Sequence, residues 1–204
     1  MLSSRYLFLL YLSIMLIITY LQQEFVLLPE LQHLDIVEEA SKAQMLERWQ
    51  RMRWLSFVVA PLMLLLRLSL VSLCLFVGGF FFADMSGRKY RDWWGIALKA
   101  QAVLLAYSAA LCIVNLTAGA NQAMALSKYS SFLFLGGDSL AQWIKIPLAA
   151  VNVFEIAYWL VMARLVAVQT ENRFAASFKF VLSSYGVGYL FYIVFLMFLV
   201  LYLS

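Results

Sequence analysis

The 204-residue chain has little charge, one histidine and two cysteines. Charged residues make up 13% of the sequence, whereas typical soluble domains contain about 25%. Hydrophobic residues make up 65%, and the mean hydropathy is +0.86, so the polar surface is too small to enclose a soluble core. Two cysteines exclude a disulfide scaffold. The composition therefore predicts an integral membrane protein.

Catalytic and metal-binding motifs are also scarce. The segment Gly137-Asp-Ser-Leu140 matches the first block of a hydrolase family that needs a downstream Asp-x-x-His, but the only histidine, His33, lies upstream. His33 and Glu30 form one Glu-x-x-His unit, whereas di-metal bundles need two such units and two further glutamates. Cys74 and Cys112 lack the spacing of a metal or redox pair. We therefore expect no enzymatic activity, no cofactor and no bound metal.

Five apolar runs have about the length needed to cross a bilayer. They are Tyr6–Leu21, Trp54–Phe82, Ile96–Thr117, Ile144–Val168 and Val181–Leu203. The second would be about 43 Å long as a helix, against a hydrocarbon core of about 30 Å, so it must tilt, project or break at Pro61, Arg67 or the Gly78-Gly79 pair. Small residues four positions apart in the last run, Ser184 and Gly188, favour close helix packing.

The pattern predicts an all-α, polytopic membrane bundle with five transmembrane helices and one extramembrane amphipathic helix. Residues 1–22 are expected to form an uncleaved signal anchor, because no small-x-small cleavage site follows the first run. Residues 23–53 have early acids, late bases and apolar positions at helical spacing, which favours an outer helix lying at the membrane interface, with a partner-docking helix as the alternative. Residues 54–204 would form a four-helix membrane domain.

The distribution of lysine and arginine predicts the orientation, because cytoplasmic loops retain more of these residues. Eight bases fall on the side of the N-terminus: Arg5, Arg88, Lys89, Arg91, Lys99, Arg164, Arg173 and Lys179. Six fall on the other side: Lys42, Arg48, Arg51, Arg53, Lys128 and Lys145. We therefore expect a multi-pass protein, placed in a bacterial inner membrane, with its N-terminus cytoplasmic and its C-terminus outside.

The expected inner loop, residues 83–95, combines basic and aromatic side chains. Arg88, Lys89 and Arg91 stand next to Trp93 and Trp94. Anionic lipid headgroups are the usual partners of such a loop, whereas nucleic acid would need a larger basic surface. We expect the lipid bilayer and its anionic headgroups to be partners of the chain, and nucleic acid not to be.

Polar side chains inside the apolar runs form a candidate buried network. Arg67 and Glu155 lie near the middle of the second and fourth runs, which cross the membrane in the same direction, so the two charges are expected at similar depth and paired. Asn152, one turn before Glu155, and Asn115 in the third run could join them. The pair is interpreted first as a structural lock between helices, with a proton or substrate pathway as the alternative.

The second half of the chain resembles a known family. The resemblance rests on Gly87-Arg-Lys-Tyr-Arg-Asp-Trp-Trp94, Gly95-Ile-Ala-Leu-Lys-Ala100, Pro147-Leu-Ala-Ala-Val-Asn-Val-Phe-Glu-Ile-Ala-Tyr-Trp159 and Arg173-Phe-Ala-Ala-Ser-Phe-Lys179. These segments look like the bacterial branch of the Ypt-interacting (Yip) domain membrane proteins, over about residues 55–203. Asn152 stands where the family's acid is expected, and the eukaryotic Asp-Leu-Tyr-Gly-Pro signature is absent, so GTPase binding is not implied. The resemblance implies a helical membrane protein that assists assembly or trafficking.

Two functions follow from these observations. The first is a non-enzymatic scaffold or accessory subunit that holds a membrane-protein partner or a second copy of the chain. The second is a small transporter or permease that uses Arg67 and Glu155. A water-filled cavity reaching the two side chains would favour transport, whereas a sealed pair would favour the scaffold.

Overall fold

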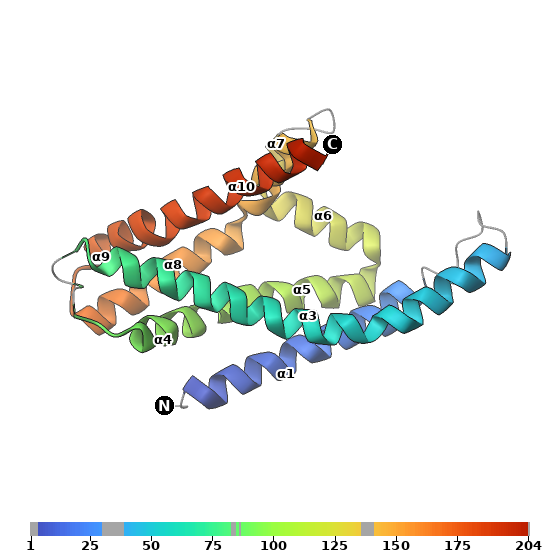
Figure 1. Ribbon diagram of the computed structural model, residues 1–204, viewed down its shortest axis with the longest axis horizontal. Helices are drawn as coiled ribbons and strands as arrows, with labels where there is room; N and C mark the ends of the chain where they lie inside the picture. Colours follow the sequence, from blue (N-terminus) through green and yellow to red (C-terminus); the bar gives the residue numbers. More distant parts are fainter. Residues whose placement is uncertain (1–3, 30–38, 83–84, 86, 136–140, 204) are drawn as a thin grey trace. The chain divides into compact units, whose positions relative to one another are not determined.

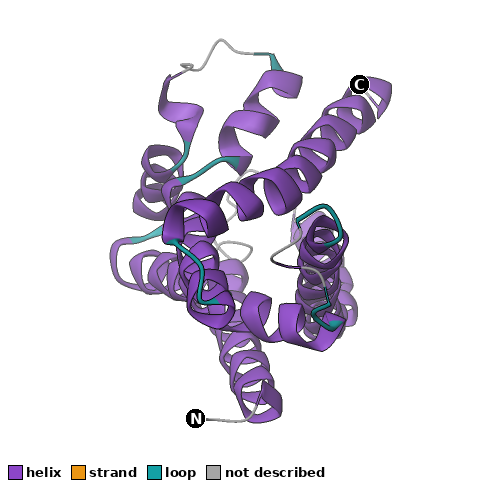
Figure 2. Ribbon diagram, turned by 90° about the vertical axis from the view of Figure 1, so that its left-hand side faces the viewer, coloured by secondary structure: helices purple, strands orange, loops and turns teal. Residues whose placement is uncertain are grey.

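The computed structural model describes residues 4–29, 39–82, 85, 87–135 and 141–203. The regular structure in these residues is helical (Figures 1 and 2). Within them, Ser131 and Asn152 form an isolated β-bridge outside any strand. The predicted all-α fold is therefore confirmed. Glu30, His33 and the Gly137–Leu140 motif lie outside the described residues.

The described helices follow the expected runs, with additional short elements. In chain order they are α1 Ser4–Gln22, η1 Gln23–Leu27, α3 Glu39–Gly79, α4 Tyr90–Ala100, α5 Ala102–Ala118, α6 Ala120–Ser130, η3 Phe132–Leu135, α7 Gln142–Ala150, α8 Val153–Thr170, α9 Phe174–Val181, η4 Leu182–Gly186 and α10 Val187–Leu203. Five segments are long and apolar enough to cross a membrane: Ser4–Leu27, Gln44–Gly79, Tyr90–Ala118, Val153–Thr170 and Phe174–Tyr202. The chain is a multi-pass membrane protein.

Helix α3 is continuous through two of the three predicted break points and ends at the third, the Gly78-Gly79 pair. It runs through Pro61 and Arg67 and ends at Gly79. Its 41 residues correspond to about 62 Å, roughly twice the hydrocarbon thickness, so α3 must extend beyond the bilayer or tilt strongly. From Glu39 onward, the expected outer helix is therefore the beginning of α3 and not a separate element. The division of the chain at residues 22 and 53 stays a prediction.

The chain forms two compact units, Met1–Arg67 with Ser108–Met124 and Leu68–Tyr107 with Ala125–Ser204. In the first unit, polar side chains join the end of α1 to α3. Glu24 on the π-helical turn η1 forms an ion pair with Arg53, and the buried Gln23 amide donates to the Arg53 carbonyl oxygen at 3.4 Å. The Arg53 guanidinium also lies 5.6 Å from the centre of the Trp49 ring. These contacts fix α1 against the polar part of α3.

The core of the second unit is aromatic, and α8 packs against both α4 and α9. The Trp93 ring lies 5.2 Å from that of Phe180, which also meets Phe82 edge-on at 5.3 Å. Trp93 is only 1% exposed because it shares the buried face of α4 with Ile96 and Ala97, at helical spacing. Its side chain thus lies inside the protein, which differs from the headgroup contact expected from the sequence.

The end of α3 crosses η4 and α10 at small side chains. A Cβ atom on Gly78 would coincide with the Ser184 side chain, and a Cβ on Gly188 would lie 2.6 Å from the Cys74 sulfur. Cys74 and Gly78 stand four residues apart, so they share one face of α3. Ser184 and Gly188 have the same spacing and share the opposing face. The expected close packing at Ser184 and Gly188 is therefore present, and its partner is the last turn and a half of α3.

The expected run Ile144–Val168 is interrupted between α7 and α8. Val151 and Asn152 leave the helical conformation, with ψ values of 106° and 166°. Two neighbours bind carbonyl oxygens near the break: Tyr189 donates its hydroxyl to Ala150 at 2.7 Å, and the Phe132 N–H donates to Val151 at 3.1 Å. These bonds pair carbonyl groups that the break leaves without a helical partner.

Candidate functional site

The candidate site begins with Glu155 in the first turn of α8. Asn152 is the N-cap of this helix, and its side-chain oxygen accepts a hydrogen bond from the Glu155 N–H at 2.7 Å. The carboxyl group therefore lies beside the positive end of the helix dipole, where negative charge is stabilised. The interruption of the span thus creates a capped helix start for an acidic residue.

The Glu155 carboxyl group joins α8 to the π-helical turn η4. Its Oε1 atom accepts a hydrogen bond from the Tyr185 hydroxyl at 2.8 Å and one from the Trp159 indole N–H at 3.2 Å. Glu155 is 3% exposed and Tyr185 is 5% exposed, so the carboxyl group and the phenol are closed to solvent, whereas Trp159 is half-buried. Single π-helical turns occur frequently at functional positions, and η4 is the turn that carries Tyr185.

Aromatic rings surround this carboxyl group. Tyr185 meets Tyr158 and Trp159 edge-on, with ring centres 5.8 and 5.9 Å apart. Tyr189 meets Trp159 edge-on at 5.8 Å, and its hydroxyl reaches the end of α7. The edge-on contacts are the favourable geometry for aromatic pairs. The rings therefore connect both sides of the helix break to η4 and α10.

The structure places the four predicted network residues in two units. Asn152 and Glu155 belong to the second unit and are in direct contact. The sequence predicted them as neighbours on one helix face, whereas Asn152 precedes the helix and caps the Glu155 N–H. Arg67 and Asn115 are half-buried residues of the first unit, on α3 and α5. The Arg67–Glu155 pair and the participation of Asn115 stay predictions.

Sequence reasoning missed two members of this site, Trp159 and Tyr185. Trp159 stands four residues after Glu155, so helical spacing alone places it on the same face. Tyr185 lies 30 residues away, and no local pattern connects it to Glu155. Only the packing of η4 against α8 brings the tyrosine to the carboxyl group.

The residues expected to contact headgroups have different roles. Arg88 donates to the backbone carbonyl of Gln169 and so holds its loop against the end of α8. Lys89 and Arg91 are exposed, and Trp94 is half-exposed. Contact of these residues with lipid stays a prediction.

Metal-ion ligands do not cluster in the described part of the chain. There, the structure places no three His, Cys, Asp or Glu side chains where they could hold a metal ion together. The hydrogen-bonded groups around Glu155 are a phenol, an indole and an amide, of which the indole can only donate. Within this geometry, the carboxyl group acts as a hydrogen-bond acceptor that joins helices.

The chain was also compared with known proteins. No family model matches it, and neither a curated protein nor a solved structure matches it. The resemblance to the bacterial Yip-domain proteins therefore stays a prediction.

Proposed function

We propose that this protein is a non-enzymatic membrane scaffold or accessory subunit that assists the assembly of another membrane complex. The main support is the closed environment of Glu155, whose Oε1 atom accepts bonds from Tyr185 and Trp159. A carboxyl group used in this way stabilises one arrangement of helices, because truncating it would remove the acceptor of both hydrogen bonds. The partner is a membrane protein or a second copy of the chain.

The scaffold proposal predicts a stoichiometric partner in mild detergent. The tagged full chain, expressed at low level and purified, should yield a complex of defined mass by native mass spectrometry. Denaturing mass spectrometry should identify one membrane protein, or this chain alone at two or more copies. A control purification with the same tag on an unrelated five-span protein removes adventitious species. A purely monomeric chain in several mild detergents would count against the scaffold.

A small transporter is the second candidate, and the broken α7–α8 segment favours it. Discontinuous helices in transporters present helix ends near the midplane to substrates or ions, and here the start of α8 carries Glu155. Proteoliposomes containing a pH-sensitive dye would discriminate between the candidates. Under transport, the wild type dissipates a proton gradient and Glu155→Gln does not, while Glu47→Gln behaves as wild type. Equal, background-level flux from all three supports the scaffold.

We also propose that the protein lies in a bacterial inner membrane with its N-terminus in the cytoplasm. The eight-to-six distribution of basic residues supports this orientation. A reporter that is active only outside the cytoplasm, fused after Ser204, should therefore be active, and one fused at the loop containing Gly87 should be inactive. The opposite pattern would reverse the orientation.

A further inference from the structure

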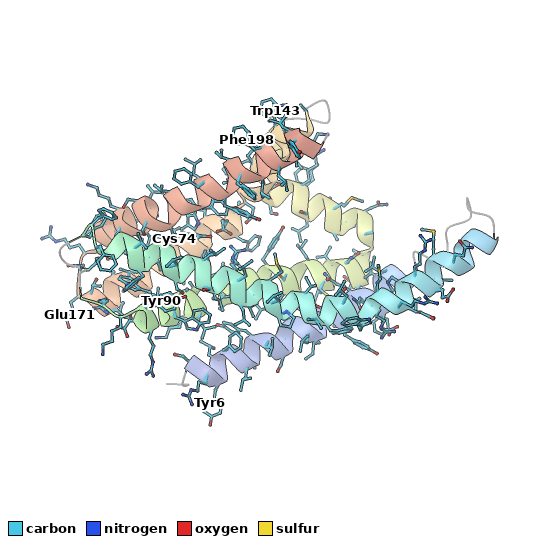
Figure 3. The ribbon with its side chains drawn as sticks, in the orientation of Figure 1. Tyr6, Cys74, Tyr90, Trp143, Glu171 and Phe198 are labelled. Carbon is cyan, nitrogen blue, oxygen red and sulfur yellow. The ribbon has the colours of Figure 1, made fainter. Side chains whose placement is uncertain are left out.

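Four membrane-spanning segments meet at one end of the second unit. Gly79 ends α3 and Tyr90 begins α4, while Thr170 ends α8 and Phe174 begins α9. These helix ends lie at one end of the ribbon (Figure 1). The Arg88–Gln169 hydrogen bond and the Trp93–Phe180 ring contact hold them together. Glu171 lies at this end in Figure 3, and the Tyr90 hydroxyl donates to the Ser69 carbonyl oxygen of α3 at 3.2 Å. Because spanning helices end at the membrane surface, these residues lie at the level of the lipid headgroups.

Exposed basic side chains gather on this end. We call four of them the basic rim: Lys89, Arg91, Arg173 and Lys179. Among the described residues, none of the four forms an ion pair with an acidic side chain. The described acids between them are Asp92, which accepts a hydrogen bond from the Lys89 N–H at 3.2 Å, and Glu171. The rim therefore carries an excess of positive charge.

Exposed aromatic residues accompany the basic rim. Phe81 is 82% exposed and Phe80 is 67% exposed at the end of α3, and Phe174 is exposed at the start of α9. Tyr90 and Trp94 are half-exposed and lie against each other on the first turns of α4. Bases beside exposed aromatic rings are typical of surfaces that contact both headgroups and the upper acyl chains.

We propose that the basic rim binds the headgroups of anionic phospholipids in the membrane that the chain spans, with Phe80 and Phe81 anchored among the acyl chains. This inference does not depend on the scaffold function. It extends the loop predicted from the sequence by adding Arg173, the N-cap of α9, and Lys179 in the last turn of α9. It also assigns Arg88 to holding the rim in place. The ligand group is the phosphodiester, which lysine and arginine attract by charge and hydrogen bonding.

Titration of purified full-length protein in detergent with phosphatidylglycerol or phosphatidylcholine, followed by native mass spectrometry, tests the proposal. The wild type should prefer phosphatidylglycerol, and the rim variant Lys89→Gln, Arg91→Gln, Arg173→Gln, Lys179→Gln should bind it at least roughly tenfold more weakly. The matched control removes four other bases: Arg48→Gln, Arg51→Gln, Lys128→Gln, Lys145→Gln. It should keep the wild-type preference. Equal binding of both lipids by the wild type, or equal loss in both variants, overturns the proposal.

Two further measurements keep the test decisive if the rim variant does not fold. Raising the salt concentration should weaken binding of phosphatidylglycerol by the wild type while leaving phosphatidylcholine unaffected, because exposed charges are screened. Millimolar inorganic phosphate should not displace the lipid. Salt-independent binding, or displacement by phosphate alone, would contradict a lipid site at the rim.

Discussion

Substitution Glu155→Ala should lower the free energy of unfolding by about 3–5 kcal/mol. The change removes the acceptor of two hydrogen bonds, one from the buried Tyr185 hydroxyl and one from the half-buried Trp159 indole. Loss of the acceptor of a buried hydroxyl is costly, and Tyr185 is only 5% exposed. The measurement is thermal or denaturant unfolding of the purified protein in detergent.

The matched control for this prediction is Glu47→Ala. Glu47 is an exposed carboxylate of α3 that pairs with Arg51 at 2.6 Å, so its loss should change stability by less than about 1 kcal/mol. Tyr185→Phe should cost about 1–2 kcal/mol alone and almost nothing in the Glu155→Ala background, because the bond is then already lost. Additive effects of the two substitutions would show that the hydrogen bond does not contribute.

The predicted Arg67–Glu155 pair is tested by extending the same series. If the two charges pair, Arg67→Ala should also cost several kcal/mol, while Arg67→Leu with Glu155→Leu should recover much of the loss, since no charge is then left alone. If the pair serves transport, the double variant will fold but will not move protons. Single variants as stable as the wild type would instead indicate solvated charges and favour a water-lined pathway.

Substitution Gly78→Ala should destabilise the protein by about 1–3 kcal/mol through overpacking. The new methyl group would overlap the Ser184 Cβ atom, and a change of side-chain rotamer does not move that atom, so it cannot relieve the contact. Relief requires α3 to move away from η4, which weakens the close packing of small residues that holds membrane helices together. Detergent thermal unfolding again measures the effect.

A compensating exchange separates this clash from other effects of alanine. Ser184→Gly removes the side chain that the new methyl group meets, so Gly78→Ala with Ser184→Gly should recover at least half of the loss. Gly95→Ala is the control, because no atom lies within 4 Å of the added methyl group. It should be neutral or stabilising by up to about 1 kcal/mol, as alanine favours helix over glycine. A harmless Gly78→Ala would mean that α3 does not pack closely against η4.

The number of membrane spans and the all-α class could be derived from the sequence alone. Both depend on a local property, the presence of windows of about 18 or more apolar residues, and a chain in lipid must pair its backbone groups within each such window. The close packing at Ser184 and Gly188 was also readable, because four-residue spacing places small residues on one helix face. The identity of the opposing residues, Cys74 and Gly78, was not.

Only the tertiary structure decided where helices continue and where they break. Apolar composition is the same for a continuous and an interrupted helix. The sequence offered Pro61, Arg67 and the Gly78-Gly79 pair as possible breaks, and α3 ends only at the last of them. The interruption at Val151 and Asn152 was not predicted. An interruption in a bilayer is stable only where other segments bind the freed carbonyl groups, and Tyr189 does so from α10.

The sequence predicted the acidic residue of the candidate site but not its hydrogen-bond partners, because those partners depend on tertiary packing. The sequence indicated Glu155 because inserting a carboxyl group within an apolar run costs free energy, and this cost depends only on the residue and its sequence neighbours. Its hydrogen-bond partner Tyr185 and the inward position of Trp93 depend on which helix faces meet. Lipid-facing and protein-facing positions are equally apolar in a membrane protein, so only the packing of η4 and α9 against α4 and α8 distinguishes them.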